Sequence, residues 1–308
     1  MAITTKAEIS SYYKSCTLCP RECGVNREKS KGFCGESSTV RISRAALHMW
    51  EEPCISGESG SGTIFFSGCQ LKCSFCQNND IASSKRGGEI SISRLSEIFF
   101  ELRDQGANNI NFVTPSHFAP SIIEAISIAR EKGFSLPFVY NCGGYESAET
   151  IRALSGYIDI FLPDFKYFKP ETAERYSHAK NYPEIAKKAI EEMVKSVGKP
   201  VYDEKGIMQR GVVVRHLILP SHYKESIDII KYLYATYGDD IVISIMNQYT
   251  PMECETHSEL KRKLTQYEYN KVIGAAVSLG IKNAYIQEGE TQSESFIPPF
   301  DMSGVYRP

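Results

Sequence analysis

Seven of the ten cysteines lie in two groups within the first quarter of the chain. One group, the three-cysteine motif, is C-x3-C-x2-C and consists of Cys69, Cys73 and Cys76. Three thiolates on one tight loop can hold three irons of a [4Fe–4S] cluster, which normally takes four cysteines. The remaining iron then keeps an open position, as a catalytic metal does for its substrate. The alternative is a structural zinc or a ferredoxin-type cluster with a distant fourth cysteine, although zinc sites favour paired C-x2-C units.

The other group lies near the N-terminus, and we refer to it as the four-cysteine set: Cys16, Cys19, Cys23 and Cys34. Its spacing is C-x2-C-x3-C-x10-C, so four thiolates fall within nineteen residues. Such a set can close a tetrahedral zinc site or hold a second [4Fe–4S] cluster. The spacing predicts metal binding and leaves the choice between zinc and iron–sulfur open.

Three cysteines stand alone in the sequence: Cys54, Cys142 and Cys254. Cys54 directly precedes the first expected strand and could act as a hydrogen donor or as a further ligand. A buried, unreactive thiol is the interpretation that we favour for Cys54, because free cysteines are usually buried in cores. We expect Cys142 and Cys254 to be structural in the same way.

The compartment of the chain decides how clustered cysteines behave. No apolar signal peptide opens the sequence, and apolar runs such as 211–219 are far shorter than the ~20 residues of a membrane span. We therefore expect a cytoplasmic protein without a membrane partner, whose thiols stay reduced. Lys and Arg number 35 and Asp and Glu 37, and the resulting net charge of −2 argues against a nucleic-acid partner.

From Thr63 onward, short apolar runs alternate with amphipathic stretches. The runs predict strands at 63–67, 109–114, 138–141, 157–166, 212–218, 241–246 and 284–287. The stretches predict helices at 91–105, 120–132, 146–156, 183–197, 223–236 and 266–279. Alternation of this kind indicates a parallel sheet covered on both faces, either barrel-like or doubly wound. In both architectures, ligands bind at the carboxyl ends of the strands.

Composition divides the chain into three parts. Residues 1–60 form a cysteine-rich, metal-binding segment that ends in SGESGSG at 56–62, which we expect to be a flexible joint. Residues 61–290 form the α/β barrel. The Pro-rich tail, 291–308, is expected either to pack over the barrel or to extend freely.

The three-cysteine motif, with Phe75 directly before its last cysteine, resembles the signature of the radical SAM superfamily. The subgroup that the chain resembles comprises homologues of pyruvate formate-lyase activating enzyme, most of whose substrates are unassigned. The matching segments cover nearly the whole chain and are 19–27, 50–57, 109–117, 162–167, 213–220 and 248–252. Trp50, Glu51 and Glu52 belong to this subgroup pattern, which assigns them no mechanistic role.

The resemblance implies an α/β fold with a partial (β/α)6 TIM-like barrel of the radical SAM type. It also implies that the three-cysteine motif holds a [4Fe–4S] cluster whose open iron binds S-adenosylmethionine (SAM). One electron would cleave SAM to methionine and a 5′-deoxyadenosyl radical, which abstracts hydrogen from an unidentified substrate, with a protein glycyl residue as one candidate. A flavodoxin- or ferredoxin-type electron donor is the expected partner.

Two alternative functions are compatible with the same residues. The first is a radical SAM enzyme that modifies RNA or a small molecule, although the chain has no basic run. The second is a non-enzymatic iron–sulfur electron carrier, which would need a fourth ligand near the motif and no SAM pocket.

Charged residues at strand ends are the next candidates for the site. By the resemblance, Phe75 would flank the adenine of SAM, and Asp164 and Lys166 would contact SAM. Arg215 lies within an apolar run, where a charge is costly unless paired. Its partner could be the SAM carboxylate or, equally, Asp164 or a glutamate. His216 alternates to the opposite face of the strand and should pack under a helix.

Polar residues at other strand ends complete the prediction. Asn141 and Gln248 could bond the ribose of SAM or serve as turn residues. Many relatives hold the SAM amino group with a Gly-Gly-Glu stretch, and this chain has 113–117 there instead, without a carboxylate. Thr114 or Ser116 could supply the oxygen acceptor. His117 could face the substrate, although a lone histidine in a loop is more often solvated.

Overall fold

One open sheet forms the framework of the chain in the computed structural model, which describes residues 11–252, 255–287 and 298–307. Its strands follow the order β10-β9-β8-β6-β5-β4-β2-β1-β3, and β7 pairs with β8. The strands are β1 (Val40–His48), β2 (Ser61–Phe66), β3 (Gly88–Ile90), β4 (Ile110–Val113), β5 (Phe138–Cys142), β6 (Ile160–Pro163), β7 (Val201–Tyr202), β8 (Met208–Leu217), β9 (Val242–Met246) and β10 (Ala284–Ile286).

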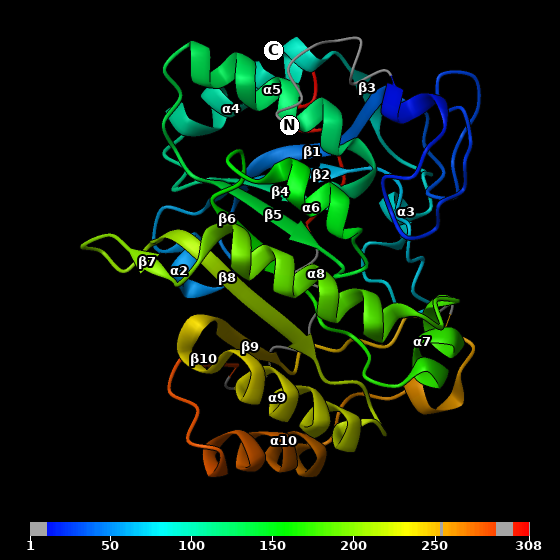
Figure 1. Cartoon of the computed structure of the whole chain (residues 1–308), viewed down its shortest axis with the longest axis vertical. Coiled ribbons are helices and arrows are strands. Elements are labelled where there is room, and N and C mark those ends of the chain that lie inside the picture. Colours follow the sequence, from blue (N-terminus) through cyan, green and yellow to red (C-terminus); the bar gives the residue numbers. More distant parts are fainter. Residues whose placement is uncertain (1–10, 253–254, 288–297, 308) are drawn as a thin grey trace.

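Helices connect the parallel strands and pack against the sheet (Figure 1). The α-helices are α2 (Pro53–Ser56), α3 (Asn79–Ala82), α4 (Ile92–Asp104), α5 (Ala119–Glu131), α6 (Ala148–Leu154), α7 (Pro170–Ser177), α8 (Tyr182–Val197), α9 (Tyr223–Tyr237) and α10 (Gln266–Ser278). Three short 3-10 helices occupy Ser116–Phe118, Gly238–Asp240 and Ser258–Leu260.

The path from β2 through β4, β5, β6, β8 and β9 to β10 is parallel throughout. Each strand is followed by a crossover that brings the chain back to start the next strand, so all carboxyl ends lie at one edge. The sheet does not close on itself, because β10 and β3 stand at its two ends. The predicted α/β class with a partial barrel is therefore confirmed.

The helix starts expected from the sequence are also observed. Ser91 caps α4 by accepting a hydrogen bond from the backbone N–H of Arg94, and Ser147 caps α6 in the same way. Thr265 and Glu268 form a capping box at the start of α10. These local signals fix where each helix begins, and the apolar stripe then turns it onto the sheet.

The Gly/Ser stretch at 56–62 is not the flexible joint that its composition suggested. Ser56 ends α2 and Ser61 begins β2, and both are buried. A Cβ at Gly62 would lie 2.9 Å from the carbonyl oxygen of Asn109 and 3.0 Å from the Cβ of Leu102. Close packing, rather than mobility, therefore accounts for this glycine.

Strand β1 precedes residue 61 and yet pairs antiparallel with β2, so the boundary expected at residue 60 falls inside a continuous sheet. The described part of the tail packs over the barrel, one of the two arrangements expected. Arg44 pairs with Asp301 at 2.7 Å, and the side chain of Arg94 donates to the carbonyl oxygen of Gly304.

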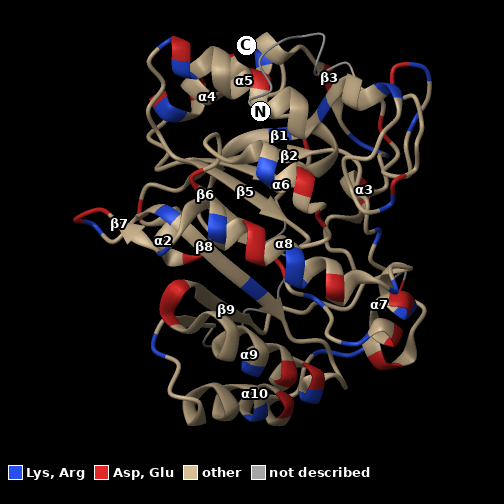
Figure 2. Cartoon of the chain, in the orientation of Figure 1, with Lys and Arg blue, Asp and Glu red and all other residues tan. Residues whose placement is uncertain are grey.

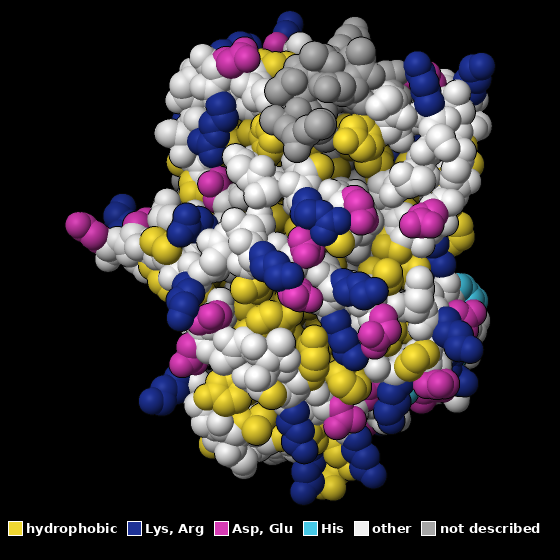
Figure 3. All heavy atoms as spheres, in the orientation of Figure 1, with side chains coloured by type: hydrophobic (Ala, Val, Ile, Leu, Met, Phe, Trp, Pro, Cys, Tyr) yellow, Lys and Arg dark blue, Asp and Glu magenta, His cyan; other side chains and the backbone are white. Residues whose placement is uncertain are grey.

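Within the described ranges, no helix is both long and apolar enough to cross a membrane. Acidic and basic side chains are interspersed along the helices (Figure 2) and over the face shown in Figure 3. Strand β8 contains two arginines, Arg210 and Arg215. Arg210 is exposed, whereas Arg215 is half-buried and lines the cavity described next.

Candidate active site

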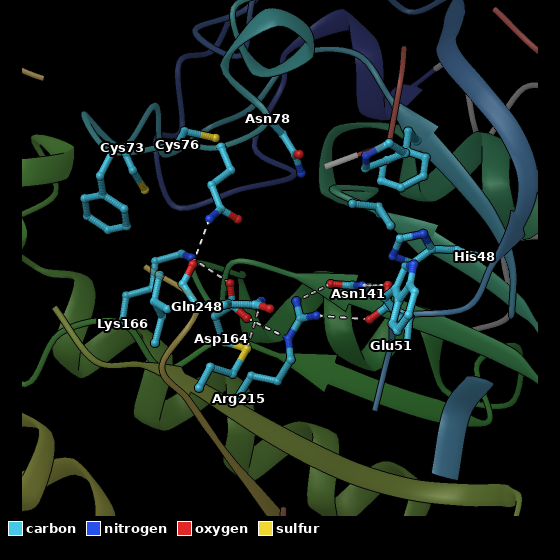
Figure 4. Close-up of a pocket in the computed structure, with 18 residues that line it drawn as sticks. His48, Glu51, Cys73, Cys76, Asn78, Asn141, Asp164, Lys166, Arg215 and Gln248 are labelled. Atoms are coloured by element: carbon cyan, nitrogen blue, oxygen red, sulfur yellow. Dashed lines mark hydrogen bonds and ion pairs between the residues drawn. The ribbon is translucent and has the colours of Figure 1, made fainter. Parts of the chain in front are cut away.

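The carboxyl ends of the parallel strands surround a cavity of about 210 Å³ (Figure 4). Eight of the residues predicted for the site line it: Cys73, Phe75, Cys76, Asn141, Asp164, Lys166, Arg215 and Gln248. A second cavity of about 120 Å³ shares part of this wall and adds Cys69 and Thr114. Strand exits that are far apart in sequence are thus brought together, as the rule for parallel sheets predicts.

The three-cysteine motif forms a tight loop directly after β2. Gly68, with φ +83°, and Lys72, with φ +53°, allow its sharp turns. The backbone N–H of Leu71 donates to the Sγ of Cys69 at 3.4 Å, and the hydroxyl of Ser177 donates to the Sγ of Cys73 at 3.1 Å. Both thiols therefore already have the hydrogen-bond donors that a metal-bound thiolate uses.

Burial dominates the acid–base behaviour of Cys69 and Cys76. Burial, with a smaller contribution from neighbouring thiols, raises the pKa of Cys69 to about 11 and that of Cys76 to about 12. The ammonium group of Lys166 acts in the opposite direction on both. These two thiols can both ionise only if a cation balances their charge, which is what a bound metal cluster provides.

Asp164 links the two cations of the cavity. Its carboxylate accepts from the Nζ of Lys166 at 2.6 Å and from the Nε of Arg215 at 2.9 Å. Burial opposes ionisation of Asp164, but Arg215 and Lys166 together hold its pKa below the usual value. The carboxylate thus stays charged and fixes both basic side chains.

Arg215 has internal partners in the structure, which is one of the two arrangements that the sequence left open. Besides Asp164, it donates from Nη1 to Glu51 at 3.2 Å and from Nη2 to the side-chain oxygen of Asn141 at 2.6 Å. Glu51 also accepts from the side-chain amides of Asn111 and Asn141 at 3.0 and 3.3 Å. Arg215 therefore lies at the centre of a charged network that spans the cavity floor.

Aromatic and amide side chains form the remaining walls. The ring of Phe75 packs among Tyr167, Tyr176 and Tyr249, with centroid distances of 6.2–6.4 Å. Gln248 is tied to the cysteine loop through its carbonyl oxygen, which accepts from the side chain of Gln77 at 3.0 Å. Both predicted residues therefore lie in the cavity wall, next to the motif.

The loop that follows β4 carries the hydroxyls of Thr114 and Ser116, the two candidate acceptors for the amino group of SAM, and places them in different surroundings. Thr114 lines the second cavity, whereas Ser116 is fully buried and lines neither cavity. The hydroxyl of Ser116 donates to Glu146 at 2.7 Å and accepts from the side-chain amide of Gln70 at 2.8 Å. The structure thus places Thr114, and not Ser116, among the cavity residues.

Two histidines near the site are buried. His117 is 2% exposed and its Nε2 lies 2.6 Å from the carbonyl oxygen of Ser67, so the expectation of a solvated histidine is wrong. Burial lowers the pKa of His117 to about 3. His216 lies on the buried face of β8, with its Nδ1 2.7 Å from the carbonyl oxygen of Phe165, as expected.

The isolated cysteines differ in position. Cys54 is 1% exposed and packs with Val139, Leu162 and Met208, away from the cavity. Burial raises the pKa of its thiol to about 12, which agrees with a structural role. Cys142 is also buried, although it contributes to the wall of the second cavity. Cys254 lies outside the described residues.

The four-cysteine set lies beside the three-cysteine motif. The backbone N–H of Cys69 donates to the carbonyl oxygen of Cys34 at 3.1 Å. A Cβ at Gly32 would lie 3.5 Å from the Sγ of both Cys23 and Cys34, so these two sulfurs are close neighbours. All four thiols are free, and three of them are buried.

A family model described as the radical SAM superfamily matches residues 63–233, which include the three-cysteine motif and β2 through most of α9. The chain belongs to the radical SAM superfamily. An uncharacterized protein of Methanocaldococcus jannaschii, MJ0674, is 30% identical over 291 residues, which cover 91% of this chain and 80% of that protein.

Several solved structures match the chain at TM-scores below 0.5. SuiB of Streptococcus suis, bound to the precursor peptide SuiA, has a TM-score of 0.48 and 11% identity, over 72% of this chain and 47% of SuiB. The protein anSMEcpe with bound AdoMet has a TM-score of 0.48 and 15% identity, over 69% and 57%. The methylornithine synthase PylB has a TM-score of 0.47 and 13% identity, over 89% and 70%. This chain spans about half the length of SuiB and of anSMEcpe.

Membership of the superfamily implies a [4Fe–4S] cluster and SAM, and the residues of the motif fit the cluster. Among the described residues, no three His, Cys, Asp or Glu side chains converge on one point. A [4Fe–4S] cluster does not need such convergence, because each thiolate binds a different iron. Three free thiols on one loop that line one cavity are therefore suited to a cluster rather than to a single ion.

Two residues at the far end of the radical SAM cavity received no role from the sequence. In Figure 4, His48 and Glu51 lie opposite Cys73 and Cys76. His48 ends β1 and Glu51 follows it. The sequence did not predict this strand, because charges interrupt its apolar residues. The segment 50–57, which the family resemblance singled out, was the available signal for Glu51.

Proposed function

We propose that this radical SAM enzyme cleaves SAM reductively and uses the resulting radical to abstract hydrogen from a substrate. One observation carries the proposal: three free thiols of one loop share a cavity with Asp164, Lys166 and Arg215. Cys69, Cys73 and Cys76 would hold the [4Fe–4S] cluster. When bound, the cluster supplies the electron that breaks the C–S bond of SAM and yields methionine and a 5′-deoxyadenosyl radical.

The charged network would orient the cofactor. SAM presents an amino group, a carboxylate and a sulfonium, so it needs both an acidic and a basic partner. Asp164 keeps its charge because of Arg215 and Lys166, and it offers an acceptor to the amino group. Arg215 makes three internal hydrogen bonds, and its remaining N–H groups would donate to the carboxylate of SAM. Asn141 and Gln248 would bond the ribose, and Thr114 would supply an oxygen acceptor to the amino group of SAM.

Aromatic walls would keep water from the radical. Phe75, packed against three tyrosines, lines one side, and Phe65 and Trp50 line the same cavity. Exclusion of water protects a reactive intermediate from side reactions. The end that holds His48, Trp50 and Glu51 would then receive the substrate, because it lies opposite the thiols (Figure 4).

The finer assignment follows the subgroup that the sequence resembles. We infer an activating-enzyme-like reaction on a protein glycyl residue in the cytoplasm, with a flavodoxin- or ferredoxin-type protein as electron donor. The cavity supports this inference by joining a second hollow lined by Arg44, Leu47 and Met49, through which a segment of chain could approach. RNA remains the less favoured substrate class, because the net charge is −2 and acidic and basic side chains are interspersed over the face shown in Figure 3.

The decisive experiment is a single-turnover assay. The protein is reconstituted anaerobically with iron and sulfide, reduced with dithionite, and supplied with SAM. We expect 5′-deoxyadenosine and methionine in the wild type and neither product in Cys73→Ala. A fully loaded [4Fe–4S] protein that forms no 5′-deoxyadenosine would overturn the proposal.

The glycyl assignment is tested separately by adding candidate substrate proteins, in which one glycyl residue would become the radical, to the assay. A doublet radical signal in electron paramagnetic resonance (EPR) that collapses to a single line on deuteration of the glycine α-position is the expected result. Formation of 5′-deoxyadenosine without any such signal, together with deuterium transfer from another substrate class, would overturn the glycyl assignment and leave the SAM chemistry intact.

A further inference from the structure

The segment that carries the four-cysteine set has no regular structure of its own. Residues 15–39 contain neither helix nor strand. The segment nevertheless buries Cys16, Cys19 and Cys34 to 8% exposure or less, and no disulfide joins its described cysteines. Loop segments that lack a hydrophobic core usually need a cross-link, and bound metal is the usual one where thiols stay free.

Tight turns fold the segment back on itself and bring two of the four thiols close to each other. The backbone N–H of Glu22 donates to the carbonyl oxygen of Cys19 at 3.0 Å, and that of Gly24 donates to Cys16 at 3.1 Å. The sulfurs of Cys23 and Cys34 flank Gly32, each 3.5 Å from the position of a Cβ there. A larger residue at position 32 would therefore occupy the space between two of the thiols.

A buried cation without a carboxylate partner faces these thiols. Arg27 is 0% exposed, and within the described ranges it forms no salt bridge. Its guanidinium donates to the carbonyl oxygens of Glu36, Ser37 and His117, and its Nη1 lies 3.9 Å from the Sγ of Cys16.

A fully buried guanidinium costs several kcal/mol unless a negative charge balances it. The carbonyl dipoles around Arg27 satisfy its hydrogen bonds but supply no net charge. Four thiolates on a divalent ion, or on a [4Fe–4S] cluster, would leave a net negative charge beside it. The thiol of Cys16, 3.9 Å from the guanidinium, belongs to a group that could provide this charge once a metal ionises it.

We propose that Cys16, Cys19, Cys23 and Cys34 hold a second, thiolate-bound metal centre, whose negative charge Arg27 balances. Both zinc and an iron–sulfur cluster bind four thiolates, but no three ligating side chains among the described residues converge on one point, which favours a cluster, and the experiment distinguishes the two. This centre is separate from the proposed reaction with SAM, and its existence does not depend on that reaction.

The second centre also positions the three-cysteine motif. The carbonyl oxygen of Cys34 accepts from the backbone of Cys69, and a Cβ at Gly68 would lie 2.8 Å from that same oxygen. Arg21, which lies between Cys19 and Cys23 in sequence, donates to the carbonyl oxygens of Gln70 and Ser177 at 3.0 and 2.9 Å. The hydroxyl of Ser177 in turn donates to the thiol of Cys73. Loss of the second centre should therefore loosen the loop that holds the first cluster.

The test uses the full-length chain with Cys69, Cys73 and Cys76 all changed to alanine, so that only the second centre remains. After anaerobic purification, elemental analysis should find about one zinc or about four irons per chain. Adding Cys19→Ser and Cys34→Ser should remove this metal. Cys54→Ser in the same background is the matched control, because it changes a buried lone thiol elsewhere and should leave the metal content unchanged.

A metal-free triple variant that is folded by circular dichroism would overturn the proposal, as would metal that survives the loss of Cys19 and Cys34. Neither result depends on SAM cleavage, so failure of the proposed reaction would be seen separately. A measurement on the wild type covers the case in which the variants do not fold. Alkylation of the four cysteines should increase at least tenfold after chelation, and unchanged labelling would overturn the proposal.

Arg27 has its own test. We expect Arg27→Met to lose the second metal to a chelator 10–100-fold faster than the wild type, which is about the effect of removing an outer partner of a metal site. Arg27→Lys keeps the charge and should retain most of the metal. Equal loss from both variants would show that packing, and not charge, is what Arg27 contributes.

Discussion

The two groups of cysteines are neighbours in space but face different surroundings. The thiols of the three-cysteine motif are partly exposed and line cavities that also hold Asp164, Lys166 and Arg215. Three of the four thiols in the four-cysteine set are buried, and the cation beside them, Arg27, is fully enclosed. One group opens onto a space for a ligand and the other is closed.

The difference agrees with how proteins use metals. Catalytic sites keep a position open, whereas structural sites fill every position with protein ligands. Three thiolates leave an iron of the cluster open, and four complete a centre. The chain therefore combines a reactive site with a support that holds it, and the backbone bond between Cys34 and Cys69 connects the two.

The largest expected effect separates the two groups by activity. Cys73→Ala should abolish the brown absorbance of the first cluster and lower 5′-deoxyadenosine formation at least ~100-fold, since the cluster supplies the electron. The metal of the four-cysteine set should remain. Elemental analysis and a product assay on the same sample check both expectations, and loss of both metals together would contradict the separation.

Arg215→Met tests the charged network on the open side. It would leave Glu51 and Asp164 buried without their shared cation, and losing one partner of a buried pair costs about 3–5 kcal/mol. We expect a large fall in the midpoint of thermal unfolding and weaker SAM binding by calorimetry. Arg152→Met is the matched control, because its pair with Glu149 is exposed and contributes at most about 1 kcal/mol. Equal falls in the unfolding midpoint and in SAM affinity for the two variants would show that the network around Arg215 contributes to neither.

Arg21→Ala tests the connection between the groups. It removes three side-chain hydrogen bonds, to Gln70, Ser177 and His178, each of which contributes about 1 kcal/mol net. We expect a broader EPR signal from the reduced first cluster and about a tenfold lower yield of 5′-deoxyadenosine. The metal content of the four-cysteine set should be unchanged. An unaltered EPR signal with a lowered yield of 5′-deoxyadenosine would show that Arg21 does not hold the three-cysteine motif in place.

Glu146 gives the smallest effect and a pH dependence. It lies between the groups, bonded to Gln70, and its charge acts on Cys19. Burial raises the pKa of Glu146 to about 7, although hydrogen bonds from Ser116 and Tyr140 oppose this. A raised pKa means that the folded state holds the proton more tightly, so stability is greatest below the unfolded value and falls as pH rises toward about 7.

Between about pH 5.5 and pH 8 the expected loss from Glu146 is about 2 kcal/mol. Glu146→Gln should remove this part of the pH dependence of the unfolding midpoint. Thermal scans of both proteins at the two pH values check it. Parallel curves for the wild type and Glu146→Gln would show that this carboxyl does not titrate in the folded chain.

The sequence predicted the parts of the site that depend on the parallel sheet. Asn141 and Asp164 could be named because carboxyl ends of parallel strands meet at one edge, and Arg215 because a charge within an apolar strand needs a partner. Glu51 could not be assigned a role in this way, because it follows the antiparallel strand β1, whose direction and pairing depend on contacts distant in sequence. Only the folded chain shows that its carboxylate meets Arg215.

Side-chain direction was the other limit. Thr114 and Ser116 are two residues apart in one loop, and the short 3-10 helix that begins at Ser116 turns that hydroxyl inward, toward Glu146. Composition also misled at Gly62, where a small residue serves close packing and not flexibility. In both cases the deciding contact lies on another element of the fold, which local pattern does not report.

Thr114 carries a consequence for the evolution and engineering of the site. Its φ is +59°, a left-handed conformation that is rare for a β-branched residue and costs on the order of 1–3 kcal/mol. Glycine would adopt the same backbone without that strain. Selection for thermal stability alone would therefore favour glycine here. The threonine places a hydroxyl at the wall of the second cavity at the cost of this strain.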